Sequence, residues 1–194
     1  MKNDTAITIP VPAWVDELVQ SFPPARGDEE RMALAIALAQ KNVENGGGPF
    51  GAVVFDDERV VAGGANHVLL SGYSIAHAEI VALLRTQARL AFDVADPDAE
   101  RARENLTLYT SAEPCCQCFG ALVWSGINRL VCAANTTDVE AIGFDEGPKP
   151  EHWVQKLAER GIATTEGVLR AEAREVLTEY TRRGGTLYGR PRKS

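Results

Sequence analysis

The sequence predicts one α/β domain in which a mixed β-sheet is covered by helices on both faces. Two observations lead to this fold class. Hydrophobic residues recur every three or four positions in some segments and alternate in others, and the two kinds of segment follow one another along the 194 residues. We expect the domain to span residues 28–183, between a proline-rich arm at 1–27 and a basic tail at 184–194.

Two helices and two strands are expected in the first third of the chain. A short helix at 14–22 lies within the arm. The second helix follows Asp28, a favourable N-cap residue, and ends at the glycines of 46–48. Residues 50–55 and 59–68 then alternate as two strands joined by a tight acidic turn.

Helices and strands alternate through the rest of the chain. Residues 91–106 form a charged surface excursion and 135–150 an acidic loop. The other predicted elements, in chain order, are a helix at 76–90, a strand at 106–111, a helix at 114–125, a strand at 129–134, a helix at 151–159, a strand at 163–169 and a helix at 171–183.

Composition excludes several classes of protein. The formal net charge of −7 argues against a protein that grips nucleic-acid phosphates, although basic residues cluster near the C-terminus. The longest apolar stretches, near ten residues, are too short to cross a bilayer, and the first residues lack the apolar run of a signal peptide. Four cysteines in a chain expected to be cytoplasmic are better metal ligands or buried thiols than disulfides.

Two motifs predict a catalytic zinc site. Cys115 and Cys118 lie three residues apart, so both thiols share one face at the start of a helix, with Pro114 suited to the first helical position. His77 begins another helix and adds a nitrogen ligand. Three protein ligands leave a fourth position open for water, as in catalytic rather than structural zinc sites. We therefore expect one catalytic zinc ion per subunit.

Glu79 is expected to act as a general base rather than as a ligand. Zinc lowers the pKa of a bound water to near neutrality, and Glu79 would carry the proton from that water to a ring nitrogen and then to the departing amine. His-x-Glu followed by Pro-Cys-x-x-Cys is the signature of zinc deaminases. Taken alone, the cysteine motif is also compatible with a redox pair or half of a structural zinc site.

The chain resembles the cytidine-deaminase superfamily, and within it the bacterial guanine deaminases. Five segments carry the resemblance: GGPFGAVV (47–54), GANHV (64–68), AHAEIVAL (76–83), TSAEPCCQCFGALVW (110–124) and TTDVEAIGFDEGP (136–148). The resemblance implies a homodimer of three-layer α/β/α subunits, each with a mixed five-stranded sheet. It also implies hydrolysis of guanine at C2 to xanthine and ammonia, and hence a place in purine metabolism.

The resemblance also implies the residues that bind the base. Asn66 would hydrogen-bond the base, Phe50 would flank its face, and Ala78 would be a further contact. Glu146 would read the base and help to move protons. Guanine presents donors at both N1 and the 2-amino group, whereas adenine and cytosine have an acceptor beside the reacting amine, so a carboxylate suits guanine. Tyr188, in the tail, would cap the site and exclude water.

Several alternatives remain open at this point. Asp138, Glu140 and Asp145 compete with Glu146 for the acidic role, and Tyr188 could equally be an exposed residue of a frayed tail. The substrate could be an ammeline-type triazine, a nucleoside, cytosine or adenosine in transfer RNA. A non-catalytic zinc protein is a third possibility, although such a protein has no need of Glu79.

Overall fold

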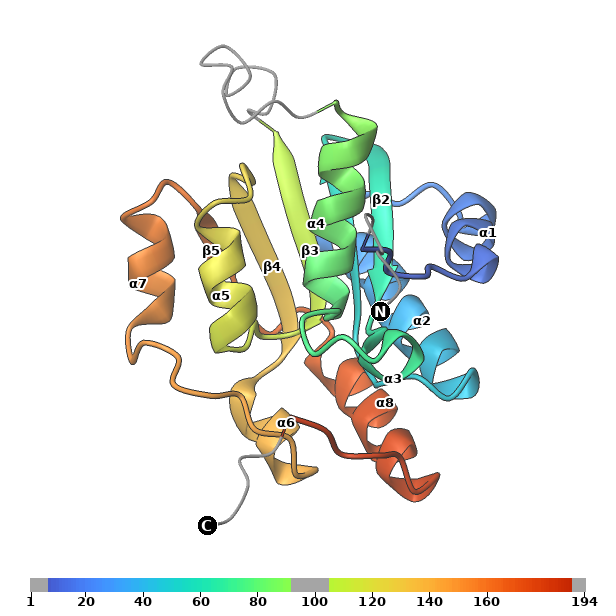
Figure 1. The fold of residues 1–194 in the computed structure, drawn as a ribbon. Coiled ribbons are helices and arrows are strands. Elements are labelled where there is room, and N and C mark those ends of the chain that lie inside the picture. Colours follow the sequence, from blue (N-terminus) through green and yellow to red (C-terminus); the bar gives the residue numbers. More distant parts are fainter. Residues whose placement is uncertain (1–6, 92–104, 190–194) are drawn as a thin grey trace.

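The computed structural model describes residues 7–91 and 105–189 and confirms the predicted α/β fold. Five strands form one mixed sheet in the order β2-β1-β3-β4-β5, with helices on both faces (Figure 1). Most of the predicted charged excursion and the basic residues Arg190, Arg192 and Lys193 lie outside the described residues. Within the described ranges, no helix is long and apolar enough to cross a membrane.

The elements follow the predicted order with two additional short helices. The helices are α1 (Ala13–Ser21), α2 (Gly27–Glu44), α3 (Val68–Ser71), α4 (Ala78–Arg89), α5 (Cys116–Leu122), α6 (Thr136–Ala141), α7 (Trp153–Ala158) and α8 (Arg170–Arg182). The strands are β1 (Gly51–Asp56), β2 (Arg59–Ala65), β3 (Leu106–Ala112), β4 (Arg129–Ala134) and β5 (Ala163–Thr165).

The strand directions bring three separate segments to one edge of the sheet. β1 is antiparallel to both β2 and β3, with Ala52 opposite Gly64 and Thr110, whereas β4 and β5 run parallel to β3. The start of β1 therefore lies beside the ends of β2 and β3. Residues that precede β1 or follow β2 and β3 must meet at this edge.

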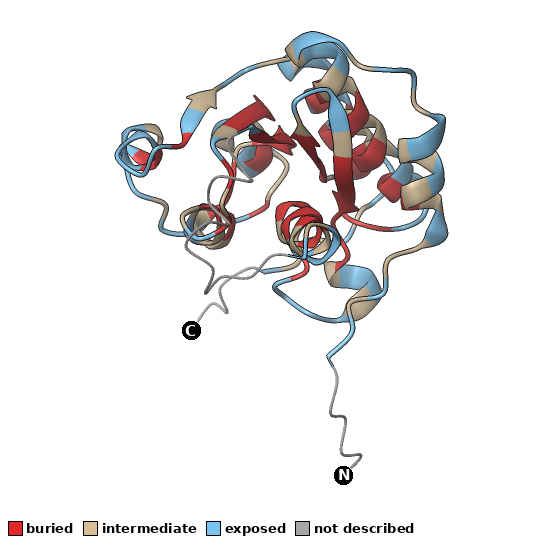
Figure 2. Cartoon of the chain, turned by 90° about the horizontal axis from the view of Figure 1, so that it is seen from above, coloured by how far each residue is buried: buried red, intermediate tan, exposed pale blue. Residues whose placement is uncertain are grey.

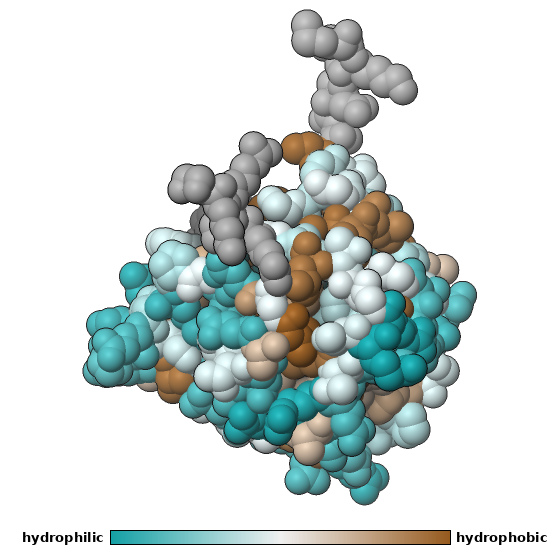
Figure 3. All heavy atoms as spheres, turned by 90° about the horizontal axis from the view of Figure 1, so that it is seen from below, coloured by the Kyte–Doolittle hydropathy of each residue, from teal (hydrophilic) through white to brown (hydrophobic). Residues whose placement is uncertain are grey.

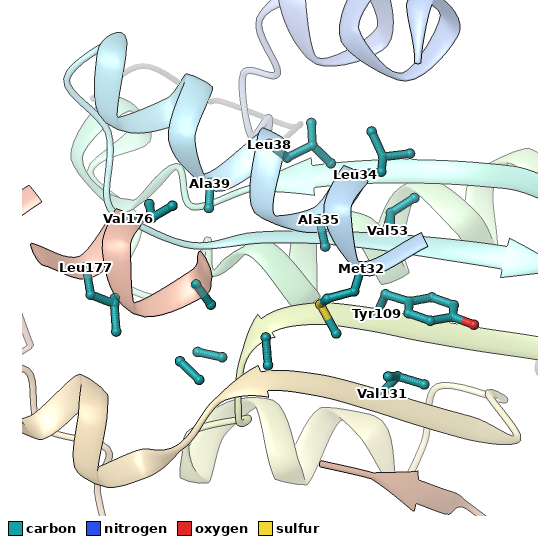
Figure 4. Close-up of a cluster of buried hydrophobic side chains, with 14 of the residues drawn as sticks. Met32, Leu34, Ala35, Leu38, Ala39, Val53, Tyr109, Val131, Val176 and Leu177 are labelled. Carbon is teal, nitrogen blue, oxygen red and sulfur yellow. The ribbon is translucent and has the colours of Figure 1, made fainter. Parts of the chain in front are cut away.

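Alternation along the strands divides the core into two clusters. Side chains of one face pack against α2 and α8, as Met32, Tyr109 and Val176 show in Figure 4. Side chains of the opposite face, Val54 among them, pack against α4, α5 and α7. Viewed from above, the buried residues are concentrated on the strands and the inner faces of the surrounding helices (Figure 2). The molecule is thus a three-layer sandwich.

The segment predicted as an arm contributes to this packing. Val15 of α1 is fully buried in the cluster with α2, and Asp16 accepts hydrogen bonds from both Arg85 and Arg89 of α4. α1 thereby covers the outer strand β2 and is joined by charged groups to the helix on the opposite face.

Local details differ from the prediction at several turns. The predicted acidic loop contains α6, because Asn135 and Asp138 form a capping box that stabilises a helix start. β2 ends at Ala65, and the predicted extension to Val68 instead begins α3. Asp28 is not the N-cap of α2, because Arg26 occupies that position and the Asp28 carboxylate accepts hydrogen bonds from other parts of the fold.

Candidate active site

A cavity opens at the sheet edge where the ends of β2 and β3 meet the start of β1. It is lined by residues from six separate segments of the sequence, among them Phe50, Asn66, His77, Cys115 and Glu146. The topology alone requires the first two to approach the end of β3, whereas the loop after α6 and the segment after α8 reach the cavity only through tertiary packing.

Three side chains of this cavity form a site for one metal ion. The ligand atoms of His77, Cys115 and Cys118 all lie within 4.8 Å of one another. Nδ1 of His77 is 3.4 Å from Sγ of Cys115 and 3.5 Å from Sγ of Cys118. Tetrahedral zinc bonds would place a sulfur and a nitrogen about 3.5 Å apart, so the three donors fit a zinc ion.

Two helix starts hold these ligands in place. His77 is the N-cap residue of α4, and Cys115 is the N-cap residue of α5, so Pro114 precedes the helix rather than occupying its first position as predicted. Gly64 of β2 allows α4 to lie directly on the sheet, because a Cβ atom there would stand 2.5 Å from the carbonyl oxygen of Ala78. The fold thus fixes the start of α4 against the strand.

The environment of the two cysteines favours a thiolate. The pKa of Cys115 is lowered to about 4, chiefly by the hydrogen bond from the Cys118 thiol, with His77 contributing and burial opposing. The pKa of Cys118 is raised by that same hydrogen bond and by burial. In the metal-free chain the pair therefore holds one thiolate and one thiol, and a metal ion would displace the remaining proton.

Glu79 is buried beside this metal site. Burial and the charge of the Cys115 thiolate raise the pKa of Glu79, so its carboxyl group holds a proton more strongly than one in water. A raised pKa makes this carboxyl group a stronger proton acceptor than an exposed one.

Glu146 is the buried acid of its loop. Its side chain is 7% exposed, whereas the competing Glu140 and Asp145 are exposed and Asp138 caps α6. Burial raises the pKa of Glu146 to about 8, with repulsion from Cys115 and Glu79 adding to the effect. Of the four acids considered from the sequence, Glu146 is the one buried against the metal site.

Aromatic and amide side chains complete the cavity. Asn66 is almost fully buried, and its Oδ1 accepts a hydrogen bond from the backbone N–H of Val68. Phe50 meets the ring of Phe144 edge-on at 5.2 Å, and Tyr188 meets the same ring at 5.0 Å. The ring of Phe144 therefore connects the segment before β1 to the segment after α8.

Tyr188 is part of the packed structure rather than of a frayed tail. Its ring and the neighbouring side chain of Leu187 pack against the core cluster that includes residues of α2 and α8. The hydroxyl group of Tyr188 is buried without a hydrogen-bond partner among the described residues. A Cβ atom on Gly48 would collide with this hydroxyl group and approach Oδ1 of Asn66 at 3.1 Å. The hydroxyl group is thus enclosed between Gly48 and Asn66.

One predicted site residue does not reach the cavity with its side chain. Ala78 is fully buried, and its methyl group packs in the cluster beneath α4. As the first residue of α4 it can offer the cavity only its backbone N–H, which has no partner within the helix.

Sequence reasoning assigned no role to several residues of the wall, Phe144 and Glu113 among them. Phe144 lies in the GFDE segment, of which only the second acid was assigned a role, and Glu113 stands two residues before Cys115. Trp124 and His152 are exposed, whereas Cys132 is buried in β4.

The chain is similar to known deaminases over most of its length. Residues 25–134 match the model of the cytidine and deoxycytidylate deaminase zinc-binding region. A solved guanine deaminase from Nitrosomonas europaea is 42% identical, with a TM-score of 0.83, and the alignment covers 91% of this chain and 97% of that one.

Two curated relatives extend the comparison. The guanine deaminase of Bacillus subtilis is 39% identical over 114 residues, which are 58% of this chain and 67% of the relative. A tRNA-specific adenosine deaminase of Haemophilus influenzae is 35% identical over 159 residues, 79% of this chain and 82% of the relative. The metal triad, the buried Glu79 and these matches agree: the chain belongs to the cytidine and deoxycytidylate deaminase family of zinc-binding proteins.

Proposed function

We propose that this protein hydrolyses guanine to xanthine and ammonia. The observation that carries the proposal is the buried carboxyl group of Glu146 in the same cavity as His77, Cys115 and Glu79. The similarity to a guanine deaminase over 91% of the chain supports the same substrate.

Glu146 provides the basis for selecting guanine. In its ionised form the carboxylate only accepts hydrogen bonds, and the two adjacent donors that guanine offers, at N1 and at the 2-amino group, would favour that ionised form although burial raises the pKa of the free group. Adenine and cytosine would place a bare ring nitrogen against the carboxylate, which is unfavourable in a buried site. Asn66 supplies an amide to a second edge of the base, and Phe50 and Phe144 provide apolar walls for its ring.

The chain's own residues supply the proton transfers. A zinc ion held by His77, Cys115 and Cys118 would act as a Lewis acid that makes a coordinated water acidic near neutral pH. Glu79 would take the proton of the attacking water, pass it to a ring nitrogen and then deliver a proton to the leaving amine. The backbone N–H of Ala78, at the start of α4, would donate to the bound base.

Tyr188 would close the cavity over the substrate. Its buried hydroxyl group has no protein partner among the described residues, so a bound base could provide one. The packing of the segment around Leu187 and Tyr188 against the core would keep bulk water from the reacting carbon.

We also propose a homodimer and a cytoplasmic location. Large exposed hydrophobic residues occur on α3, between α3 and α4, and on α4, namely Leu69, Leu70, Tyr73, Ile75 and Leu84. Figure 3, which shows the molecule from below relative to Figure 1, has a band of hydrophobic residues that reaches the middle of that side. Light scattering should give twice the chain mass, and Ile75→Glu together with Leu70→Glu should shift it to that of one chain.

The substrate is tested with the zinc-loaded protein and a panel of amino compounds. Guanine, guanosine, adenine, cytosine, ammeline and an adenosine-containing tRNA stem-loop would each be assayed for ammonia, with xanthine followed by its ultraviolet spectrum. We expect turnover of guanine and a fall of about 100-fold in kcat/KM for Glu146→Gln, because the variant replaces an acceptor with a donor. Turnover of another compound with none of guanine, or full guanine activity in Glu146→Gln, would contradict the proposal.

A further inference from the structure

A buried ion pair joins Glu113, a residue of the cavity wall, to Lys149, and so links the metal-binding segment to the loop that carries Glu146. Nζ of Lys149 is 3.1 Å from Oε2 of Glu113, and the two side chains are only 9% and 10% exposed. The residues come from different parts of the fold. Glu113 follows β3 and precedes the first cysteine ligand by two positions, whereas Lys149 follows Glu146 by three.

Thr136 closes this pair into a triangle. Its hydroxyl group donates to Oε2 of Glu113 at 2.7 Å and accepts from Nζ of Lys149 at 2.8 Å, and its backbone N–H also donates to Glu113 at 3.1 Å. Nζ of Lys149 stands 4.6 Å from the centre of the Trp153 ring. The ammonium group therefore contacts an acid, a hydroxyl group and an aromatic face.

The Glu146 loop is attached to the metal-binding segment at a second point. The backbone N–H of Cys116 donates to the carbonyl oxygen of Glu146 at 2.9 Å. Gly147 packs so closely on Cys116 that a Cβ atom would stand 2.5 Å from its sulfur. The Glu146 loop is thus attached to the segment 113–116 at two points. One is the carbonyl group of Glu146, and the other is the side chain of Lys149.

We infer that Lys149, held by Glu113 and Thr136, is the positioning residue that fixes the carboxyl group of Glu146 relative to the metal site. Lys149 does not line the cavity and has no contact with the reacting atoms, so its effect passes through Glu146. A buried pair costs desolvation energy that a surface pair does not, which is consistent with a positioning role rather than a purely stabilising one. The inference rests on the proposed role of Glu146 in binding the base.

Loss of the attachment should lower catalysis without loss of zinc. Lys149→Met removes the ammonium group, and Thr136→Val removes the hydroxyl group at nearly constant volume. We expect kcat/KM to fall about 10- to 100-fold in Lys149→Met and less in Thr136→Val, as for other residues that orient a site from behind. Thr136→Ser keeps the hydroxyl group that Thr136→Val removes, so its kcat/KM should be close to that of the wild type. Lys156→Met, which removes an exposed lysine of α7 paired with Glu159, is the matched control.

A double-mutant cycle separates positioning from general destabilisation. If Lys149 acts through Glu146, Lys149→Met should cost no more than about 2-fold in a Glu146→Gln background, because the effect has already been lost. Equal losses in both backgrounds, or wild-type kinetics in Lys149→Met, would overturn the inference.

Hydrogen exchange tests the same inference without any substrate. In zinc-loaded protein, the peptide covering 143–149 should exchange about 10-fold faster in Lys149→Met than in the wild type and the Lys156→Met control. Unchanged exchange in this peptide would overturn the inference even if activity fell. If the wild type deaminates another compound of the panel instead of guanine, the proposed function fails, and the cycle with that compound and the exchange data still decide the role of Lys149.

Discussion

The backbone N–H of Cys116 donates a 2.9 Å hydrogen bond to the carbonyl oxygen of Glu146, thirty positions later in the sequence. One contact thus joins the helix start that presents two metal ligands to the loop that presents a buried acid. Cys116 is the first residue of α5, so its N–H has no hydrogen-bond partner within the helix and is free to bind the Glu146 loop. The metal site and the buried acid are therefore joined in one structural unit, and the following predictions test its parts.

Removal of one metal ligand should remove the zinc. The wild type should bind one zinc ion per chain, and Cys118→Ala should bind almost none, because two remaining ligands hold the ion weakly. Metal content by plasma mass spectrometry, with activity before and after chelation and zinc addition, measures this. Cys132→Ala is the matched control, since that buried thiol lies in β4 and is not part of the triad. Full zinc content in Cys118→Ala would contradict the site.

Glu79→Gln should abolish proton transfer while leaving the metal in place. The amide keeps the shape of the carboxyl group but cannot carry a proton, so kcat should fall about 10³-fold. Xanthine formation and zinc content are measured on the same sample. Glu140→Gln, on the exposed side of α6, controls for loss of an acid. A drop of less than 10-fold would show that another group moves the proton.

Tyr188→Phe should weaken substrate binding without destabilising the free protein. The ring contact with Phe144 is kept, and only a hydroxyl group without a protein partner among the described residues is lost. We expect KM for guanine to rise about 10-fold, the equivalent of one hydrogen bond, and Tm to stay the same or increase. Truncation after Arg183 removes the whole segment and should cost more. Unchanged activity of the truncated chain would exclude a capping role.

His67 should make the fold sensitive to acid. Burial, assisted by the charge of Arg85, lowers the pKa of His67 to about 4, and neither ring nitrogen has a hydrogen-bond partner in the described part of the chain. The unfolded chain would take up a proton near pH 6.5 and the folded chain only near pH 4, so stability is lost as the pH falls between these values. At pH 5 this loss is about 2 kcal/mol.

The comparison of His67→Leu with the wild type isolates this contribution. The free energies of unfolding by urea should be similar at pH 7.5, and at pH 5 the variant should be relatively more stable by about 2 kcal/mol. Parallel stability curves for the two proteins from pH 7.5 to pH 5 would show that His67 does not carry the effect.

The sequence by itself determined the order of the five strands and of six helices, without α3 and α6, and it determined the metal triad. Alternation at 50–55 and 129–134 identifies strands because side chains of a strand point to opposite faces, and both segments are strands in the structure. Cys115 and Cys118 could be paired as ligands because three positions at a helix start place two side chains on one face. These relationships depend only on local geometry.

Only the tertiary structure decided which more distant residues complete the site. Glu146 is distinguished from Glu140 and Asp145 by its burial, and its loop is attached to the metal-binding segment by the hydrogen bond from Cys116 and the ion pair of Lys149 with Glu113. The approach of Tyr188 to Gly48 joins segments 140 positions apart, and the short helix α6 carries the loop into place. Such contacts depend on how whole layers pack, and no periodicity or spacing within one segment encodes that distance.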